Sequence, residues 1–401
     1  MDHRFSPMTE RLAGRGARAW EIHGRAVAAR GRGEDVIILS VGDPEFDTPP
    51  MISAAAKRAL DAGDTHYVEI CGRPALRALI AERHRARTGQ QVTADNVAMV
   101  PGAQAGLFCA SLCLGSPGDE FLTTDPVYTT YEATLQAPGA RRVAIPLQAD
   151  EGFRLDLDRL EAAVGERTRA LFLANPNNPT GTLLRDDEMA AVAELARRHD
   201  LWIVADEVYA DLVFESRFRH FASIPEIRDR LVTVSSLSKS HAMTGWRVGW
   251  MVMPSAMTPH IENLLLSMLY GMPGFIQAAA LTAIRDGDDD VERMRRAYRA
   301  RRDLVLSRLA ECPLLRCVAP EAGMFMLVDV AATGLDNHEF VTRLYQQQHV
   351  SVLDAEAFGA VGRGFVRLSF SGGEARLEEG CRRIIEFVHG LGAGESAASV
   401  Q

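Results

Sequence analysis

Short apolar runs alternate with helical patterns through the middle of the chain. Uninterrupted apolar runs of strand length occupy 170–174, 201–205 and 231–236. Between the first two lies RDDEMAAVAELARRHD (185–200), where apolar residues recur at helical spacing and acids occupy the first turn. Continuous apolar strands separated by helices are typical of a parallel sheet buried on both faces. The pattern therefore predicts an α/β domain over about 46–288.

The last third of the chain has a different pattern. It predicts a long helix at 291–310, apolar strands at 324–330, 350–353 and 364–370, a helix near 336–348 and a final helix. This mixture indicates an α+β unit, and the N-terminal helix and the strand at 36–40 are expected to pack with it. The small domain would then comprise 1–45 and 289–391, followed by a frayed tail at 392–401.

Composition and charge exclude several classes of protein. A chain of 401 residues is longer than a single core usually supports, which favours one large and one smaller domain. No apolar run reaches the roughly 18–20 residues of a membrane span, and the N-terminal segment lacks the apolar region of a secretory signal, so a cytoplasmic protein without a membrane partner is expected. A net charge of −9 argues against a nucleic-acid partner. The arginines from Arg293 to Arg302 are expected to form a solvated helix face.

The six cysteines give no indication of metal chemistry. None forms a C-x-x-C pair, and no histidine follows one at the spacing of zinc ligands. We therefore expect reduced thiols and no metal site.

Polar side chains follow three of the predicted strands. Asp206 comes directly after 201–205, Asn175–Asn178 follow 170–174, and Lys239 follows 231–236. Ligands of open α/β sheets bind beyond the carboxyl ends of the strands, so these groups would meet at one rim. Each alone is more typical of a turn or a surface residue. Together they supply the carboxylate, amides, hydroxyls and amine that pyridoxal 5'-phosphate (PLP) needs.

Several motifs carry a resemblance to a known family. They are SVGDPEFDTP (40–49), THY with GRPALR (65–77), NPNNPTG (175–181), DEVY (206–209), SLSKSHAMTGWRVGW (236–250) and FGAVGRGFVRLSF (358–370). In this order they resemble the landmarks of class I aminotransferases of fold type I, over about 40–370. The resemblance implies a mostly parallel seven-stranded sheet between helices and a smaller α+β domain. It also implies a PLP enzyme that moves an α-amino group from an L-amino acid to a 2-oxo acid by a ping-pong mechanism.

The resemblance implies a role for each residue around the cofactor. Lys239 would bind PLP covalently and then move a proton, for which burial near positive charge favours its neutral amine. Asp206 would bind the protonated pyridine nitrogen, and Tyr209 and Asn178 would bind the ring 3-oxygen. The remaining cofactor residues would be Gly102, Ala103 and Gln104 at a helix N-terminus, Ser236 and Arg247 at the phosphate, Tyr128 stacked on the ring, and Tyr67 from the neighbouring subunit.

The dimer implied by Tyr67 would have shared active sites. The chain departs from the family pattern at Pro101, Val127 and His241, and none of these changes removes a required group. His241 could simply fill space.

The substrate residues are also expectations from the resemblance. Arg367 would bind the substrate α-carboxylate as a bidentate pair, with the backbone of Gly42 beside it. Trp20 and Ile22 would close over the substrate, because the N-terminal helix of relatives often acts as a lid.

The choice of amino donor is the least defined expectation. The stretches AWEIHGRA (19–26), ENLLLSMLYGMPGFIQ (262–277) and GMFMLVD (323–329) most resemble transaminases that take arginine, or another basic amino acid, with pyruvate as acceptor. A guanidinium needs a carboxylate partner when it is desolvated. Glu69, contributed across the dimer, is the first candidate and Glu45 a weaker one; both are equally typical of surface residues.

Other functions share this fold and remain open. A C–S β-lyase of the cystathionine type would use the same lysine, and an aminotransferase could take an aspartate or aromatic donor instead. A ligand-sensing transcription regulator is disfavoured, because no helix-turn-helix extension precedes the domain.

Overall fold

The computed structural model of the chain describes residues 5–12 and 16–398. Its largest sheet has seven strands in the order β2-β8-β7-β6-β5-β3-β4. The strands are β2 (Val97–Val100), β3 (Glu120–Asp125), β4 (Arg141–Pro146), β5 (Thr168–Ala174), β6 (Trp202–Asp206), β7 (Leu231–Ser236) and β8 (Gly249–Val252). All neighbours are parallel except at β8, which runs antiparallel to both β2 and β7. The predicted mostly parallel seven-stranded sheet is therefore confirmed.

Helices cover both faces of this sheet, because alternate residues of each strand point to opposite sides. On one face, strand residues such as Val100, Phe172 and Val234 pack with α5 (Ala103–Leu114), α6 (Tyr131–Gln136) and α9 (Thr258–Met268). The opposite face is covered by α3 (Pro50–Asp61), α4 (Pro74–Thr88), α7 (Leu157–Ala162), α8 (Asp186–Arg198) and α10 (Gly274–Asp286). None of the helices among the described residues is long and apolar enough to span a membrane.

The C-terminal third forms smaller sheets. A four-stranded antiparallel sheet has the order β12-β13-β10-β9, from β9 (Arg316–Cys317), β10 (Phe325–Asp329), β12 (Leu353–Asp354) and β13 (Phe365–Ser369). The N-terminal β1 (Ile37–Ile38) pairs in parallel with β11 (Val350–Ser351). The predicted single strand at 350–353 is wrong, because the chain leaves one sheet and enters the other on either side of Val352.

The N-terminal segment packs with this C-terminal third, as predicted. Ile22 and Ala26 of α2 (Gly16–Gly31) share one core with β10, α12 (Asn337–Gln348) and α13 (Glu374–Ala398). The short helix α1 (Pro7–Arg11) precedes α2. The boundaries proposed between the two domains stay a prediction. The predicted frayed tail overlaps α13, which extends to Ala398, and 399–401 lie outside the described residues.

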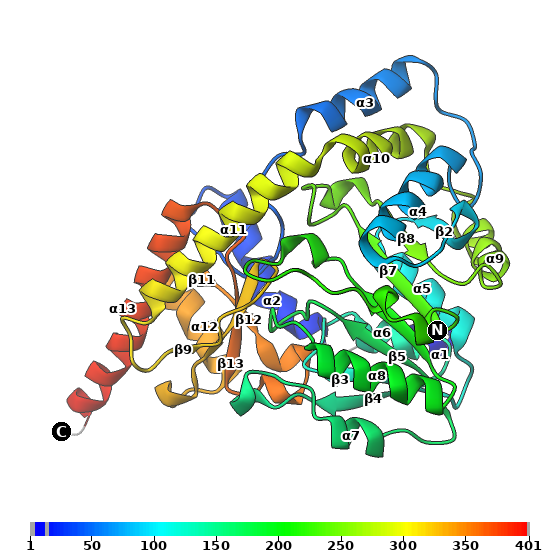
Figure 1. Ribbon diagram of the computed structural model, residues 1–401. Helices are drawn as coiled ribbons and strands as arrows, with labels where there is room; N and C mark the ends of the chain where they lie inside the picture. The colour runs from blue at the N-terminus through cyan, green and yellow to red at the C-terminus, as the bar shows by residue number, and fades with distance from the viewer. Residues whose placement is uncertain (1–4, 13–15, 399–401) are drawn as a thin grey trace.

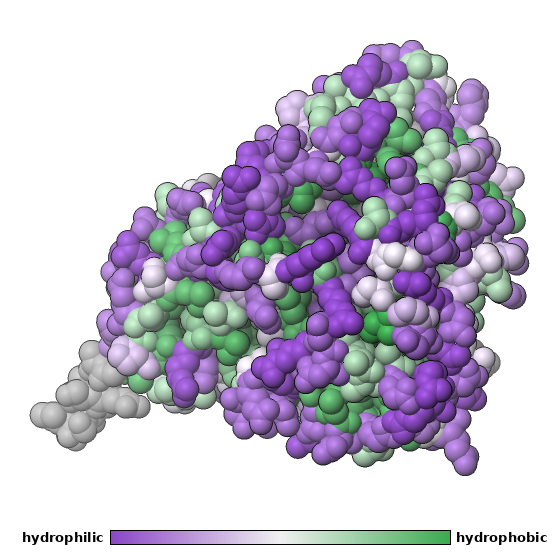
Figure 2. Space-filling view, in the orientation of Figure 1, coloured by the Kyte–Doolittle hydropathy of each residue, from purple (hydrophilic) through white to green (hydrophobic). Residues whose placement is uncertain are grey.

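The helix α11 (Asp288–Leu309) connects the two parts of the molecule, running from α10 to α13 (Figure 1). Hydrophilic side chains cover its outer side (Figure 2), as predicted for the arginines. Arg301 and Arg302 are exceptions, since they are 6% and 8% exposed. They form ion pairs with Glu45 and Glu215 respectively. The prediction of a solvated face is wrong at these two positions, because this end of α11 packs against the small-domain core.

Candidate active site

A cavity of about 220 Å³ lies at the carboxyl ends of β5, β6 and β7. Of the polar groups expected at one rim, Asn178, Asp206 and Lys239 face it, whereas Asn175 and Asn177 do not. Its lining comprises Trp20, Val41, Gly42, Ala103, Gln104, Leu107, Tyr128, Ala174, Pro176, Asn178, Asp206, Val208, Tyr209, Ser236, Ser238, Lys239, Thr244, Arg247 and Arg367. The strands bring these side chains together because parallel strands end at the same edge.

Lys239 places an amine inside the cavity. It lies in the turn after β7, and its Nζ donates a hydrogen bond of 2.7 Å to the carbonyl oxygen of Gly42. The pKa of Lys239 is lowered to about 8, chiefly by burial; Asp43 opposes this lowering, and the nearby Arg367 and Arg247 contribute to it. A sizeable fraction of the amine is therefore neutral near physiological pH. A neutral amine can act as a nucleophile and as a base.

Asp206 places a buried carboxylate at the end of β6, the strand next to β7. It ends β6, and its Oδ2 accepts a hydrogen bond of 2.9 Å from the Tyr131 hydroxyl, while its Oδ1 accepts from the Val208 amide. Burial raises the pKa of Asp206 to about 6, although the bonds from Tyr131 and Val208 oppose the rise. Within the described residues Asp206 has no cationic partner. A buried carboxylate without one is costly, so the site fits a protonated ring nitrogen.

The N-terminus of α5 forms an anion site. Gly102 caps this helix at a φ of +83°, and a Cβ there would come within 2.3 Å of the Arg247 guanidinium, so only glycine fits. Arg247 is fixed by a bond of 2.9 Å to the carbonyl of Thr244. The amides of the first turn, the Arg247 charge and the Ser236 hydroxyl suit a phosphate group. The Gln104 side chain is held aside by Thr130 and Thr134.

Arg367 supplies a second positive group. It lies on β13 and is 2% exposed. Its guanidinium donates to the Ser40 carbonyl at 2.8 Å and to the Asn178 Oδ1 at 3.3 Å, while its Nε has no partner in the part of the chain that the structure describes. Among the described residues no carboxylate pairs with it, which leaves it able to bind the carboxylate of a ligand. Burial also raises the pKa of Tyr209, so its hydroxyl stays protonated.

The two N-terminal substrate residues have different positions. Trp20 lines the cavity, as expected of a residue that closes over a ligand. Ile22 does not line it, and this prediction is wrong: the side chain is 5% exposed within the small-domain core. Two residues along an α-helix are about 200° apart, so Trp20 and Ile22 cannot face the same cavity. Glu45, the weaker candidate for the substrate side chain, is engaged with Arg301 instead.

Tyr67 and Glu69 lie away from this cavity within one chain. Tyr67 is 82% exposed and contacts the Tyr270 ring, with 4.6 Å between the ring centroids. Both residues line a separate open depression beside Arg73. Their expected place in the active site of a neighbouring subunit stays a prediction.

Some residues at the site were not found from the sequence. Ser238 and Thr244 belong to the motif at 236–250, and Tyr131 lies three residues after Tyr128, yet no role was assigned to them. Tyr131 is fully buried, and its bond to Asp206 makes it the most consequential omission. Its position at the start of α6, three residues after Tyr128, was the available signal.

The comparisons with known proteins agree with this geometry. The family described as "Aminotransferase class I and II" matches residues 34–384. The arginine–pyruvate transaminase AruH of Pseudomonas aeruginosa is 50% identical over 381 residues, which cover 95% of this chain and 97% of that protein. An aspartate aminotransferase of Pyrococcus horikoshii is 33% identical, covering 89% and 92%. The solved structure of the Thermus thermophilus aspartate aminotransferase with maleate superposes with a TM-score of 0.91 at 30% identity, covering 96% and 100%.

Proposed function

Because the chain belongs to the class I and II aminotransferases, which depend on PLP, we propose that it transfers the α-amino group of L-arginine, or of another basic L-amino acid, to pyruvate. The observation that carries the choice of substrates is the 50% identity, over 95% of the chain, to an enzyme named for arginine and pyruvate. The proposal is tested by a screen of amino donors with pyruvate as acceptor. Arginine or lysine should be the best donor, and a preference for aspartate would refute this choice while leaving the transaminase chemistry intact.

The residues of the cavity fit the cofactor. Bound PLP supplies an electron-withdrawing ring that stabilises negative charge on the substrate Cα. Asp206 would hold the ring nitrogen, and the α5 N-terminus (Gly102, Ala103 and Gln104), Ser236 and Arg247 would hold the phosphate. Tyr128 would lie against the ring, and Asn178 and Tyr209 would donate to its oxygen. These assignments are supported by the place of the side chains in the lining of the cavity, by the burial of Asp206, Asn178 and Tyr209, and by the positive charge of Arg247.

The remaining residues would act on the substrate. Arg367 would orient the α-carboxylate, which fixes the Cα–H bond relative to Lys239. The Lys239 amine would then take the proton from Cα, and the Gly42 carbonyl holds that amine in place at 2.7 Å. Trp20 would exclude water from the closed site.

The attachment of PLP to the apoenzyme should become faster as pH rises toward 8. The nucleophile is the neutral amine, and the pKa of Lys239 is about 8, so each pH unit below that value should slow the reaction about tenfold. Above pH 8 the rate should level off. Stopped-flow absorbance across this pH range measures it, and a rate that falls with rising pH would contradict the neutral-amine assignment.

We further propose a homodimer in which Tyr67 completes the partner's active site. The exposed Tyr67 and Tyr270 rings and the nearby Met268 are hydrophobic side chains that a second subunit would cover. Mixing inactive Lys239→Ala subunits with inactive Tyr67→Ala subunits should restore part of the activity, because hybrid dimers keep one intact site. A fully active monomer in sedimentation would refute the shared site.

Glu69→Gln should weaken arginine use more than alanine use. A charged hydrogen bond to the guanidinium is worth about 1.5–3 kcal/mol in kcat/KM terms. Glu82→Gln, an exposed acid on α4, is the matched control and should change neither donor. Equal losses for arginine and alanine in the Glu69→Gln enzyme would exclude Glu69 as the residue that recognises the side chain.

A further inference from the structure

A second cavity, of about 250 Å³, lies on the opposite face of the large sheet. The alternation of strand residues separates it from the active site. Ser236 of β7 faces the first cavity, whereas Thr233 and Ser235 face the second; likewise Asp206 faces the first and Glu207 the second. Its other walls come from α4, α10, α11 and the turn after β6. The second cavity is as large as the active-site cavity, so it can hold a small molecule.

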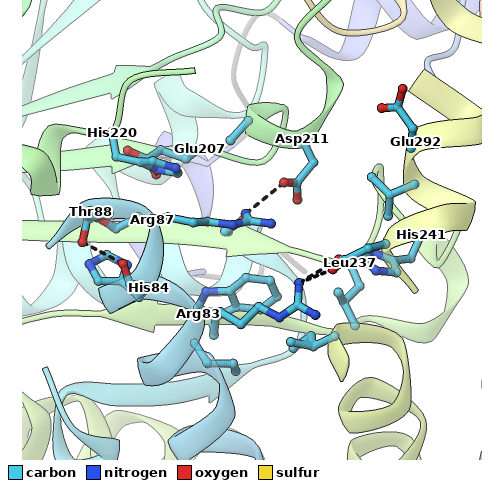
Figure 3. Close-up of a pocket in the computed structure, with 18 residues that line it drawn as sticks. Arg83, His84, Arg87, Thr88, Glu207, Asp211, His220, Leu237, His241 and Glu292 are labelled. Carbon is cyan, nitrogen blue, oxygen red and sulfur yellow. Dashed lines mark hydrogen bonds and ion pairs between the residues drawn. The ribbon is translucent and has the colours of Figure 1, made fainter. Parts of the chain in front are cut away.

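Two ion pairs form the rim of the second cavity (Figure 3). Arg83 bonds to Asp288 at 2.7 Å and Arg87 to Asp211 at 2.9 Å. These side chains are 28–67% exposed, so the rim is in contact with solvent. Each arginine is neutralised by its own aspartate, and neither charge is left over for a ligand.

The floor of the second cavity contains hydrogen-bonding groups that are not satisfied. Glu207 is 3% exposed, and its Oε2 lies 2.6 Å from the Nδ1 of His220. Among the described residues its Oε1 has no hydrogen-bond partner, and neither has the Oγ1 of Thr233, which is 4% exposed. A buried carboxylate oxygen without a partner costs free energy, so each such group calls for an explanation.

Within the described residues the neighbouring side chains do not supply the missing donors. His84 bonds to Gln90 at 2.7 Å, and His241 bonds to Ser240 and to the Ala283 carbonyl. Burial lowers the pKa of both histidines, so both are neutral. Glu292 is held by Arg295 and Arg296 on its own helix. The lining therefore contains two arginines and four carboxylates, with Glu207 the one carboxylate that no arginine neutralises.

We propose that the second cavity binds a small organic cation, a guanidinium or ammonium compound whose N–H groups donate to Glu207 and Thr233. Its positive charge would complement the acidic floor, and its apolar part would lie along Ile80, Leu237 and Trp250. A metal ion fits less well, because no group of three or more potential ligands is assembled within the described residues. This site is independent of which amino donor the active site uses.

The test titrates the holoenzyme with butylguanidinium chloride in a calorimeter. This probe has neither a primary amine to react at Lys239 nor a carboxylate to pair with Arg367. Saturable binding is expected, and butylurea, a neutral molecule of the same shape, should bind at least about tenfold more weakly. If butylguanidinium does not bind, or if butylurea binds equally well, the cavity holds only water and the proposal is wrong.

Variants locate the probe. Glu207→Gln should weaken butylguanidinium binding about tenfold or more, whereas Glu292→Gln, on the α11 wall of the same cavity, should leave it unchanged. Thr233→Val removes the other unpartnered atom without touching the Glu207–His220 pair, and it should weaken binding several-fold. Thr233→Val therefore tests the proposed cation site even if Glu207→Gln does not fold. Wild-type affinity in both variants would overturn the proposal.

Discussion

Replacing Lys239 by alanine should abolish transamination, with a loss of kcat greater than about 10⁴-fold. Among the described residues Lys239 supplies the amine that lies in the cavity, and its lowered pKa provides the neutral form that the chemistry requires. The variant should still bind PLP, because the α5 N-terminus, Arg247 and Asp206 are unchanged. Steady-state assays with arginine and pyruvate measure the activity, and gel filtration followed by absorbance measures the retained cofactor.

The chain offers an unusually clean control for this experiment, since it contains only two lysines, Lys57 and Lys239. Lys57 is exposed on α3, and Lys57→Ala should be fully active. Borohydride reduction of the holoenzyme, followed by peptide mass analysis, should label the peptide of Lys239 and leave that of Lys57 unmodified. An active Lys239→Ala enzyme, or a label on Lys57, would overturn the central assignment.

Asp206→Asn should slow removal of the substrate Cα proton by about 10²-fold or more, corresponding to about 3 kcal/mol of barrier. The amide keeps the size of the side chain but not its charge, so the protonated ring nitrogen loses its partner. Cofactor affinity should change much less, because the phosphate contacts remain. Exchange of the Cα hydrogen with deuterated solvent measures this step directly.

Tyr131→Phe provides a graded comparison for Asp206→Asn. It removes the hydrogen bond of 2.9 Å to Asp206 but leaves the carboxylate in place, so its exchange rate should lie between those of the wild type and Asp206→Asn. An exchange rate near the wild-type value in Asp206→Asn would contradict the role proposed for the carboxylate.

The sequence by itself determined the architecture and most of the cavity. The apolar runs at 170–174, 201–205 and 231–236 are buried strands because only a two-sided core accommodates an uninterrupted run. Parallel strands end at the same edge of the sheet. The turns that follow them therefore bring side chains such as those of Asn178 and Lys239 to one cavity. These conclusions depend on the pattern of apolar residues, which is visible in the sequence, and on the general rule that parallel strands end at one edge of their sheet.

Only the tertiary structure decided which distant groups touch. Four features depend on contacts between separate elements. They are the ion pair of the buried Arg301 with Glu45, the burial of Ile22 in the core, the hydrogen bond from Tyr131 to Asp206 and the unpartnered oxygen of Glu207 among the described residues. Periodicity indicates that a residue lies on one face of its helix or strand. It does not indicate what lies opposite, because that depends on how elements far apart in sequence pack in space, and that packing determines the partner, the burial and the pKa of each group.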